Sequence, residues 1–267
     1  SLDHVQVKEF PPENPFIIPS LPINQVGVPG VNPQTLHRVK VAGVVTYRDQ
    51  NLLFVQDDTS SASVLTSTAN TVVVGDRVEA IGFPEKTSGS ITLTEAQVRK
   101  IGTWKQPRPT VLKPGDVTDE RFNGLVVRLE AVVLEQKIRE GQQLLELQAG
   151  QLVFQAVLPT SAGRLKSFPI GSRVQITGIN RVQFANHVNA RTSQQDKSMP
   201  ATLDVLLRHP SDVVMLQRPP WWNWKYTAGL SVVCVVIFAT SFIWIRTLRR
   251  RVEQRTEQLK AAMARLQ

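Results

Sequence analysis

The chain has 267 residues, enough for one to three domains, and its 31 Lys/Arg exceed its 22 Asp/Glu by nine. Nine of those cations and two of those acids lie in residues 218–267, so residues 1–217 hold 22 cations and 20 acids. This distribution excludes a body that is basic throughout, and it indicates a membrane or an acidic partner near the C-terminus. The one cysteine, Cys234, excludes disulfides within residues 1–217, which is compatible with a bacterial periplasm.

Residues 1–35 are expected to hold the remnant of a strand followed by a Pro-rich linker. Residues 10–33 contain seven prolines, a density that excludes a regular helix or a central strand. We therefore predict an extended connector that packs along a barrel. Because the chain begins at Ser1 without a signal peptide, we interpret it as a processed or excised part of a longer protein.

Two stretches of the chain repeat the same patterns in the same order. RVKVAGVVT, NLLFVQ and GDRVEAIG in residues 36–104 match VVRLEAVVL, QLLELQ and GSRVQITG in residues 123–217. Alternating apolar and polar residues between Gly, Asp and Asn turns predict about five short antiparallel strands in each unit. We expect a mainly β chain with two tandem OB-like five-stranded barrels, because closure removes exposed sheet edges; a β-sandwich is the alternative. In the linker between them, residues 105–122, Thr118 or Asp119 is expected to cap a short helix.

The body offers no recognisable catalytic or metal-binding constellation. Its histidines are scattered without the spacing of a zinc site, and we interpret them as ordinary surface or half-buried residues: His4, His37, His187 and His209. Residues 57–59, Asp-Asp-Thr, could bind a cation, but turn capping suits these residue types better. Three acids are interpreted as a solvated face: Glu135, Glu140 and Glu146. We therefore expect no catalytic, cofactor-binding or metal-binding residue, no cofactor and no enzymatic activity in this chain.

Residues 226–245, YTAGLSVVCVVIFATSFIWI, run for twenty residues without a charge. A helix of that length spans about 30 Å, the thickness of the hydrocarbon core of a bilayer. Tryptophans flank the run, as is typical of membrane interfaces: Trp221, Trp222, Trp224 and Trp244. A buried core helix would need neither these tryptophans nor the arginines that follow. We therefore predict a transmembrane helix over 226–245, preceded by a juxtamembrane linker over 218–225.

Cations are denser after the predicted span than before it. Arg218 and Lys225 precede the span, whereas four arginines follow it closely: Arg246, Arg249, Arg250 and Arg251. The positive-inside rule places that side in the cytoplasm. We expect a single-pass protein of the bacterial inner (cytoplasmic) membrane, with the N-terminal modules periplasmic or otherwise extracytoplasmic and the C-terminus cytoplasmic.

Residues 246–267 carry two interleaved series of positions spaced by seven. One comprises Leu248, Arg255 and Ala262, and the other comprises Val252, Leu259 and Leu266. This pattern predicts a parallel two-stranded coiled coil with a seam of Leu248, Val252, Leu259, Ala262 and Leu266, in which Arg255 is one polar position. The alternative is a basic helix lying on anionic headgroups, and we adopt that interpretation for residues 248–251, LRRR.

Six segments together carry a family resemblance over nearly the whole chain. In order they are HRVKVAGVVTYRDQNLLFVQDDT, GDRVEAIGFP, RFNGLVVRLEAVV, LLRHPSDVVML, RPPWW and LRRRVEQRTEQL. This set resembles the sensor portion of bacterial membrane-bound signalling proteins, mainly two-component sensor histidine kinases with OB-like repeats outside the membrane. The resemblance implies that the coiled helix leads to a dimerisation and phosphoacceptor helix pair and an ATP-binding kinase domain. This sequence departs from the family pattern because it contains neither of those domains, so no phosphoacceptor histidine is assigned.

The expected function is a membrane-anchored sensory input and signal-transmission region that relays an extracytoplasmic signal through one span to a cytoplasmic kinase. The alternatives are the same front end on a diguanylate cyclase, and a membrane-tethered scaffold or adhesion protein built from OB modules. The expected partners are the lipid bilayer, a second copy in a parallel homodimer, and an extracytoplasmic ligand or protein. Nucleic acid is disfavoured, because single-strand binding needs a basic groove with stacking aromatics.

Overall fold

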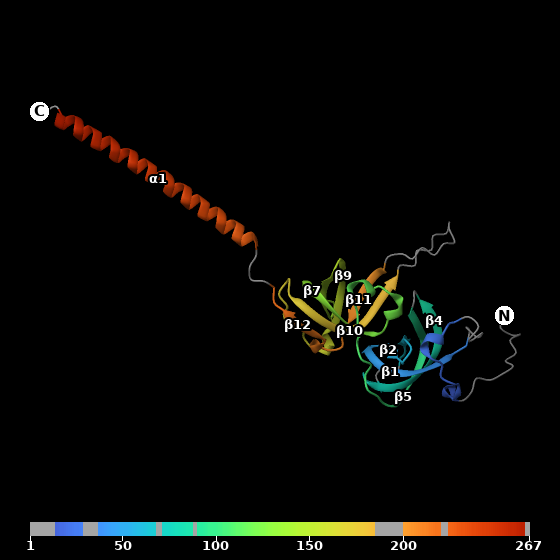
Figure 1. Ribbon diagram of the computed structural model, residues 1–267. Coiled ribbons are helices and arrows are strands. Elements are labelled where there is room, and N and C mark those ends of the chain that lie inside the picture. Colours follow the sequence, from blue (N-terminus) through green and yellow to red (C-terminus); the bar gives the residue numbers. More distant parts are fainter. Residues whose placement is uncertain are drawn as a thin grey trace, which may run out of the picture. The chain divides into compact units, whose positions relative to one another are not determined.

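The computed structural model describes residues 14–28, 37–67, 71–87, 90–184, 200–219 and 224–264. The chain divides into two compact units, Ser1–Pro219 and Pro220–Gln267. The first unit holds two closed five-stranded barrels, and the second holds one apolar helix (Figure 1). The prediction of a mainly β chain with two OB-like barrels and a C-terminal apolar helix is therefore confirmed.

The first barrel, barrel 1, has five strands: β1 (Val39–Asp49), β2 (Leu52–Gln56), β3 (Ser61–Leu65), β4 (Asp76–Thr87) and β5 (Ser90–Thr103). They neighbour one another in the order β1-β2-β3-β5-β4, and β4 pairs with β1 to close the barrel. Every pair is antiparallel except β3–β5, which is parallel. A closed Greek-key barrel of five strands is the architecture of the OB-fold.

The second barrel, barrel 2, repeats this topology with β7 (Val126–Arg139), β8 (Gln142–Ala149), β9 (Leu152–Pro159), β10 (Arg173–Phe184) and β11 (Pro200–Leu206). Its order is β7-β8-β9-β11-β10, it closes through β10–β7, and β9–β11 is the parallel pair among these five strands. Two short strands extend the sheet, namely β6 (Thr110–Val111), which is parallel to β7, and β12 (Val213–Gln217), which is antiparallel to β10.

The strand registers of the two barrels coincide, as the repeated sequence predicts. Val39 lies opposite Gly82 in barrel 1, and Val127 lies opposite Gly178 in barrel 2. Each first strand then carries a bulge at the equivalent position. A Cβ would approach a backbone carbonyl oxygen of the fifth strand to 2.7 Å at Gly82 and to 2.6 Å at Gly178. Both glycines are therefore needed for close packing of the strands.

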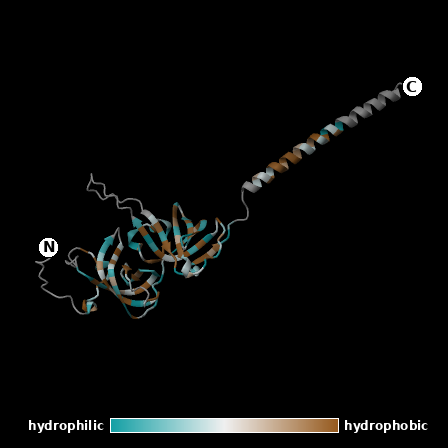
Figure 2. Ribbon diagram, turned by 180° about the vertical axis from the view of Figure 1, so that it is seen from behind, coloured by the Kyte–Doolittle hydropathy of each residue, from teal (hydrophilic) through white to brown (hydrophobic). Residues whose placement is uncertain are grey.

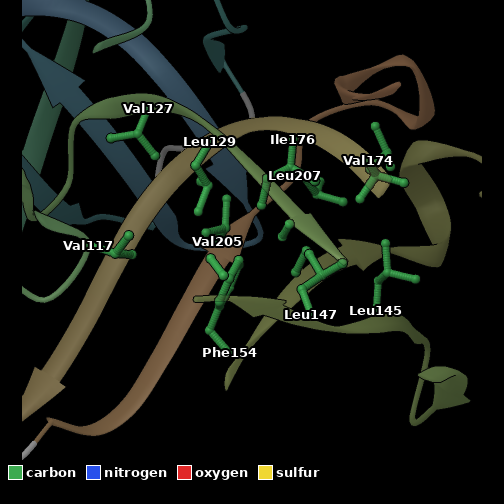
Figure 3. Close-up of a cluster of buried hydrophobic side chains, with 14 of the residues drawn as sticks. Val117, Val127, Leu129, Leu145, Leu147, Phe154, Val174, Ile176, Val205 and Leu207 are labelled. Atoms are coloured by element: carbon green, nitrogen blue, oxygen red, sulfur yellow. The ribbon is translucent and has the colours of Figure 1, made fainter. Parts of the chain in front are cut away.

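Inward-facing aliphatic side chains fill each barrel. In β8 every second residue from Gln143 to Ala149 is buried, which is the period-two pattern of a strand with one face on a core. Figure 3 shows the interior of barrel 2, where side chains from β7, β8, β9, β10 and β11 point toward one another. The labelled residues are Val117, Val127, Leu129, Leu145, Leu147, Phe154, Val174, Ile176, Val205 and Leu207.

The segment before each barrel also contributes to its core. Ile23 is fully buried in the core of barrel 1, and Leu112 is buried in the core of barrel 2. The backbone N–H of Leu21 donates to the carbonyl of Lys40 at 2.8 Å, and that of Leu112 donates to the carbonyl of Arg128 at 2.9 Å. Both segments thus meet the first strand of their barrel at equivalent points, and the Pro-rich stretch supplies core side chains as well as a connection.

Six short 3₁₀ helices among the described residues connect these elements: η1 (Pro15–Ile17), η2 (Ile23–Gln25), η4 (Pro114–Asp116), η5 (Glu120–Phe122), η6 (Thr160–Ala162) and η7 (Pro210–Asp212). The short helix predicted in the linker is η5, and Asp119 is its cap. The Asp119 carboxylate accepts a hydrogen bond from the backbone N–H of Arg121 at 2.9 Å.

The second unit contains α1 (Trp224–Ala264), a helix of 41 residues. At 1.5 Å per residue it is about 62 Å long, roughly twice the thickness of a hydrocarbon core. Its segment Thr227–Arg249 is long and apolar enough to cross a membrane. Figure 2 shows this apolar segment as a brown stretch in the first part of the helix.

The role of the Pro-rich segment in folding can be tested with two isoleucines that it contains. Ile23→Ala removes a fully buried side chain from barrel 1 and should lower the free energy of unfolding by about 2–5 kcal/mol. Ile17→Ala is the matched control, because Ile17 is 71% exposed and should change little. Urea unfolding of the full chain in detergent micelles, followed by circular dichroism, measures both variants. Equal effects would show that the segment does not contribute to the barrel.

Candidate functional site

The two barrels contact one another through the outward face of β2 and β3, the face on which OB-folds commonly bind ligands. Phe54 of β2 and Tyr47 at the end of β1 pack edge to face, with ring centroids 6.0 Å apart. Four buried aliphatic residues of barrel 2 complete this cluster: Val126, Val157, Ile179 and Leu206. We call this cluster the inter-barrel contact.

Hydrogen bonds fix the register of the inter-barrel contact. Ser61 Oγ on β3 donates to the carbonyl of Asn123 at 3.1 Å, and Gln56 Oε1 on β2 accepts from the N–H of Val126 at 3.3 Å. Gly124 lies against Ser61 with a φ of 77°, and a Cβ there would overlap Ser61 Oγ. Glycine is therefore required by both the left-handed backbone and the close approach of the two barrels.

The inter-barrel contact occupies the β2–β3 face of barrel 1. An oligonucleotide or oligosaccharide could reach that face only if the barrels separated. The equivalent cross-strand pair differs in barrel 2, because Tyr47 pairs with Phe54 whereas Glu135 pairs with Glu146. The aromatic pair is buried and the carboxylate pair is partly exposed. The two barrels thus have the same fold, but the equivalent outer faces carry different residues.

A polar row lies beside the inter-barrel contact on the outside of barrel 2. It crosses β8, β9, β11 and β10 and consists of Glu146, Gln155, Asp204 and Arg181. Arg181 Nη2 donates to Asp204 Oδ2 at 2.6 Å, while the buried Nε of Arg181 has no hydrogen-bond partner in the described part of the chain. Burial, and then the charge of Asp49, raise the pKa of Tyr47, while Arg181 opposes this shift. The row can donate and accept hydrogen bonds, and Tyr47 remains a neutral phenol.

The candidate metal and turn residues have structural roles. Among the described residues no group of three or more His, Cys, Asp or Glu could hold a metal ion. Asp57 Oδ1 accepts hydrogen bonds from Thr59 N at 2.7 Å and from Ser60 N at 2.8 Å, so the predicted turn cap is confirmed. Its Oδ2 also accepts from the N–H of Ile23 at 2.8 Å, which ties the leading segment to barrel 1. His209 caps η7, whereas His4 and His187 lie outside the described residues.

Two carboxylates of β4, one buried and one half-buried, pair with cations on neighbouring strands. The side chain of Asp76 is 3% exposed, and it accepts from Lys100 Nζ at 2.7 Å and from the N–H of Val73 at 3.0 Å. Burial alone would raise the pKa of Asp76, but these partners outweigh it and hold the pKa below its usual range. Burial likewise opposes ionisation of Glu79, and hydrogen bonds from Arg99 and Lys40 lower the pKa of Glu79 overall. These groups stabilise barrel 1 as ion pairs.

The membrane-related residues belong to α1. Trp244, at 70%, is exposed on the helix, and the Arg246 guanidinium lies 4.7 Å from the centroid of the Phe242 ring. Helical positions in α1 include Trp224, Leu248, Arg249, Arg250, Arg251, Val252, Leu259 and Ala262. Trp221, Trp222 and Leu266 lie outside the described residues. The helix thus places the basic cluster directly after the apolar segment, and the pairing of its seam stays a prediction.

Sequence reasoning missed the inter-barrel contact. Tyr47 and Phe54 are buried between the barrels. Strand alternation was the available signal, because Leu53 and Val55 point into barrel 1 and Phe54 therefore points outward. A bulky aromatic residue on an outward position indicates that something covers it.

Comparisons with known proteins do not identify a family. No protein-family model matches the chain, and no curated protein matches it. Among solved structures, a murine DNA-binding protein bound to double-stranded DNA gives a TM-score of 0.34 at 11% identity, covering 68% of this chain and 98% of that chain. An OBody bound to hen egg-white lysozyme gives 0.29 at 13% identity, covering 42% and 99% respectively. Asparaginyl-tRNA synthetase from Pyrococcus horikoshii, complexed with asparaginyl-adenylate, gives 0.29 at 16% identity, covering 42% and 23%. TM-scores this low establish neither a shared ligand nor a shared activity, and the architecture rests on the strand pairing.

Alanine substitutions at two glycines with the same backbone conformation can distinguish the loss of the inter-barrel contact from local backbone strain. Gly124 and Gly141 both have a φ of 77°, but a Cβ at Gly141 would meet nothing within 4 Å. Gly124→Ala should therefore cost about 1–3 kcal/mol more in the free energy of unfolding than Gly141→Ala, because it adds overpacking to the same strain. Urea unfolding of both full-length variants measures the difference. Equal losses would mean that the barrels do not meet at Gly124.

The buried carboxylates predict a loss of stability in acid. Because the pKa of Asp76 is lowered in the folded state, its stabilising effect is present above the unfolded value of about 3.9 and is lost as the pH falls through the folded pKa. Asp76→Asn should cost about 1–3 kcal/mol at neutral pH through loss of a charge-assisted hydrogen bond. The gap between the two proteins should narrow as the pH falls below the unfolded value and through the lower folded pKa. Unfolding curves over this range check the prediction, and a gap independent of pH would contradict it.

Proposed function

We propose that this chain is the membrane-anchored sensory input and signal-transmission region of a bacterial sensor histidine kinase. The observation that carries the proposal is the length of α1, which is roughly twice what a bilayer requires and begins with the apolar segment. The two barrels before it provide a folded body able to receive a signal. The helical residues after Arg249 connect the membrane span to a kinase domain and can transmit its movement.

The inter-barrel contact supports this function because it couples the barrels. A body held by a shared apolar cluster and by the hydrogen bonds of Ser61 and Gln56 moves as a unit. A signal bound to either barrel therefore moves the strand β12, from which residues 218–223 lead into α1. A rotation, axial shift or change of register of α1 would then carry the signal across the membrane.

The basic residues set the orientation in this proposal. Arg246, Arg249, Arg250 and Arg251 lie on the cytoplasmic side of an inner membrane, and residues 1–220 lie on the periplasmic side. Two copies form a parallel homodimer through Val252, Leu259 and the other seam positions. The chain itself performs no catalysis, and the transferred phosphoryl group belongs to the cytoplasmic domain.

A second candidate function is a membrane-tethered scaffold. The observation that favours it is the occupied β2–β3 face of barrel 1, since barrel 2 already fills the face that would otherwise recognise a ligand.

A diguanylate cyclase with the same N-terminal region differs from the kinase only in its cytoplasmic output domain. Reading the coding sequence after Gln267 separates these cases. A helix with an HE or HD acceptor motif supports the kinase, a GGDEF segment supports the cyclase, and an early stop codon supports the scaffold.

Cysteine cross-linking tests the predicted parallel dimer of the helical residues after Arg249. In a Cys234→Ser background, Val252→Cys and Leu259→Cys should form disulfide-linked dimers in membranes more rapidly than Glu253→Cys and Lys260→Cys. The control positions lie one residue further along the helix and point away from the predicted seam. Non-reducing electrophoresis after mild oxidation gives the yield at each position. A flat profile across these four positions would refute the parallel coiled coil.

A further inference from the structure

A patch of exposed apolar residues lies on barrel 2 where the chain leaves the body. It is formed by the loop before β10, by β12 and by the facing part of β7, and its apolar residues are Val132, Ile170, Val214 and Leu216. Ile170 is 70% exposed, a large fraction for an isoleucine on a folded barrel. We call these four residues the exit patch.

Strand pairing and loop packing hold the exit patch together. Arg173 at the start of β10 lies opposite Val132 of β7 on one side and opposite Gln217 of β12 on the other. A Cβ at Gly171 would lie 3.3 Å from Pro219 Cβ, so the loop that carries Ile170 packs against the last residues of the first unit. The exit patch therefore borders the point from which the chain continues toward α1.

Cations outnumber acids around the exit patch, where the facing strand β7 also carries Glu130. Residues 163–175 and 213–219 contain four cations and no carboxylate: Arg164, Lys166, Arg173 and Arg218. All four residues are exposed, and Arg173 pairs with Glu130 of β7 at 3.2 Å. Exposed apolar side chains with an excess of cations nearby match the interfacial zone of a bilayer with anionic headgroups.

The length of the connection limits how far the exit patch can lie from a membrane. Trp224, the first residue of α1, follows Pro219 by five positions, and a chain of five residues reaches at most about 18 Å. If α1 spans a bilayer, Pro219 and the loop packed against it stay within that reach of the helix start. The short covalent connection thus keeps this face close to the bilayer.

We propose that the exit patch docks barrel 2 on the surface of an anionic bilayer, with Ile170 inserted at headgroup level and the exposed cations Arg164, Lys166 and Arg218 on lipid phosphates. This inference rests on the proposed transmembrane role of α1 and deepens it. Docking restricts rotation of the body about the short connection, so that movements of the barrels reach α1 instead of being lost as free tumbling.

Site-directed spin labelling of the full chain tests the docking. In a Cys234→Ser background, single nitroxides are placed at Ile170→Cys, at Ile17→Cys and at Phe238→Cys, and the protein is reconstituted in vesicles containing phosphatidylglycerol. Ile17 is the matched control, because it is 71% exposed and lies on η1 against barrel 1. Collision with oxygen and with a water-soluble nickel complex reports the surroundings of each label. The expected result is a membrane signature at Phe238, an interfacial signature at Ile170 and an aqueous signature at Ile17.

The outcomes separate this inference from the proposed function. A label at Phe238 that remains in water would overturn the transmembrane role and the docking together. A label at Phe238 inside the bilayer with Ile170 in water would overturn the docking alone. Protection of Ile170 from both oxygen and nickel, with dipolar broadening between labels, would indicate that a second copy covers the patch and would also overturn it.

Substitution of the cations near the exit patch provides a second test of the docking. Arg164→Gln and Lys166→Gln should each reduce the ratio of docked to undocked label at Ile170 on the order of fivefold. Replacing phosphatidylglycerol by phosphatidylcholine should act in the same direction. The control Lys86→Gln removes an exposed cation of barrel 1 and should leave the ratio unchanged. A ratio that is insensitive to all of these changes would contradict the recognition of anionic lipid.

Discussion

Closure of each barrel depends on pairing between its first and fourth strands. That pairing brings β1 against β4 and β7 against β10. Gly82 and Gly178 let the same fourth strand also approach the fifth closely. Once the barrel is closed, the alternation of strand side chains divides every strand into a buried row and an outward row. The inter-barrel contact, the polar row and the exit patch are all outward rows, and their positions follow from the register of these pairs.

The inter-barrel contact uses different faces of the two barrels. Barrel 1 offers its β2–β3 face with Phe54 and Ser61, whereas barrel 2 offers side chains from β7, β9, β10 and β11. Such a contact is heterologous, because no two-fold axis relates its halves. The two barrels therefore pack without internal symmetry. The β2–β3 face of barrel 1 is covered by barrel 2, and the outer surface of barrel 2 remains exposed.

The barrels could be predicted from the sequence because they depend on local alternation and on a repeat. The pairing of Val39 with Gly82 and of Val127 with Gly178 follows from the aligned motifs. The caps at Asp57 and Asp119 were predictable for the same reason, since they act within a few residues. The apolar helix followed from its composition alone. The coiled-coil seam depends on a second copy, and it stays a prediction.

The inter-barrel contact could not be predicted in the same way. Alternation places Phe54 on the outside of its barrel, but it does not say what lies there. The contact depends on residues 70 or so positions apart, such as Gln56 and Val126, and on the left-handed backbone of Gly124. A glycine in RFNGLVV reads as an ordinary turn signal, and its close approach to Ser61 follows only from the packing of two finished barrels.

The exchange of Tyr47 and Phe54 for Glu135 and Glu146 has a consequence for how many modules such a chain can join. A heterologous joint could in principle be repeated, with the β8–β9 face of barrel 2 seating a third barrel as the β2–β3 face of barrel 1 seats the second. Such a joint would have to desolvate Glu135 and Glu146 together with Lys137, which pairs with Glu135, and the cost of burying these charges opposes it. The charged pair therefore disfavours the docking of a third barrel on that face in the way that barrel 2 docks on barrel 1.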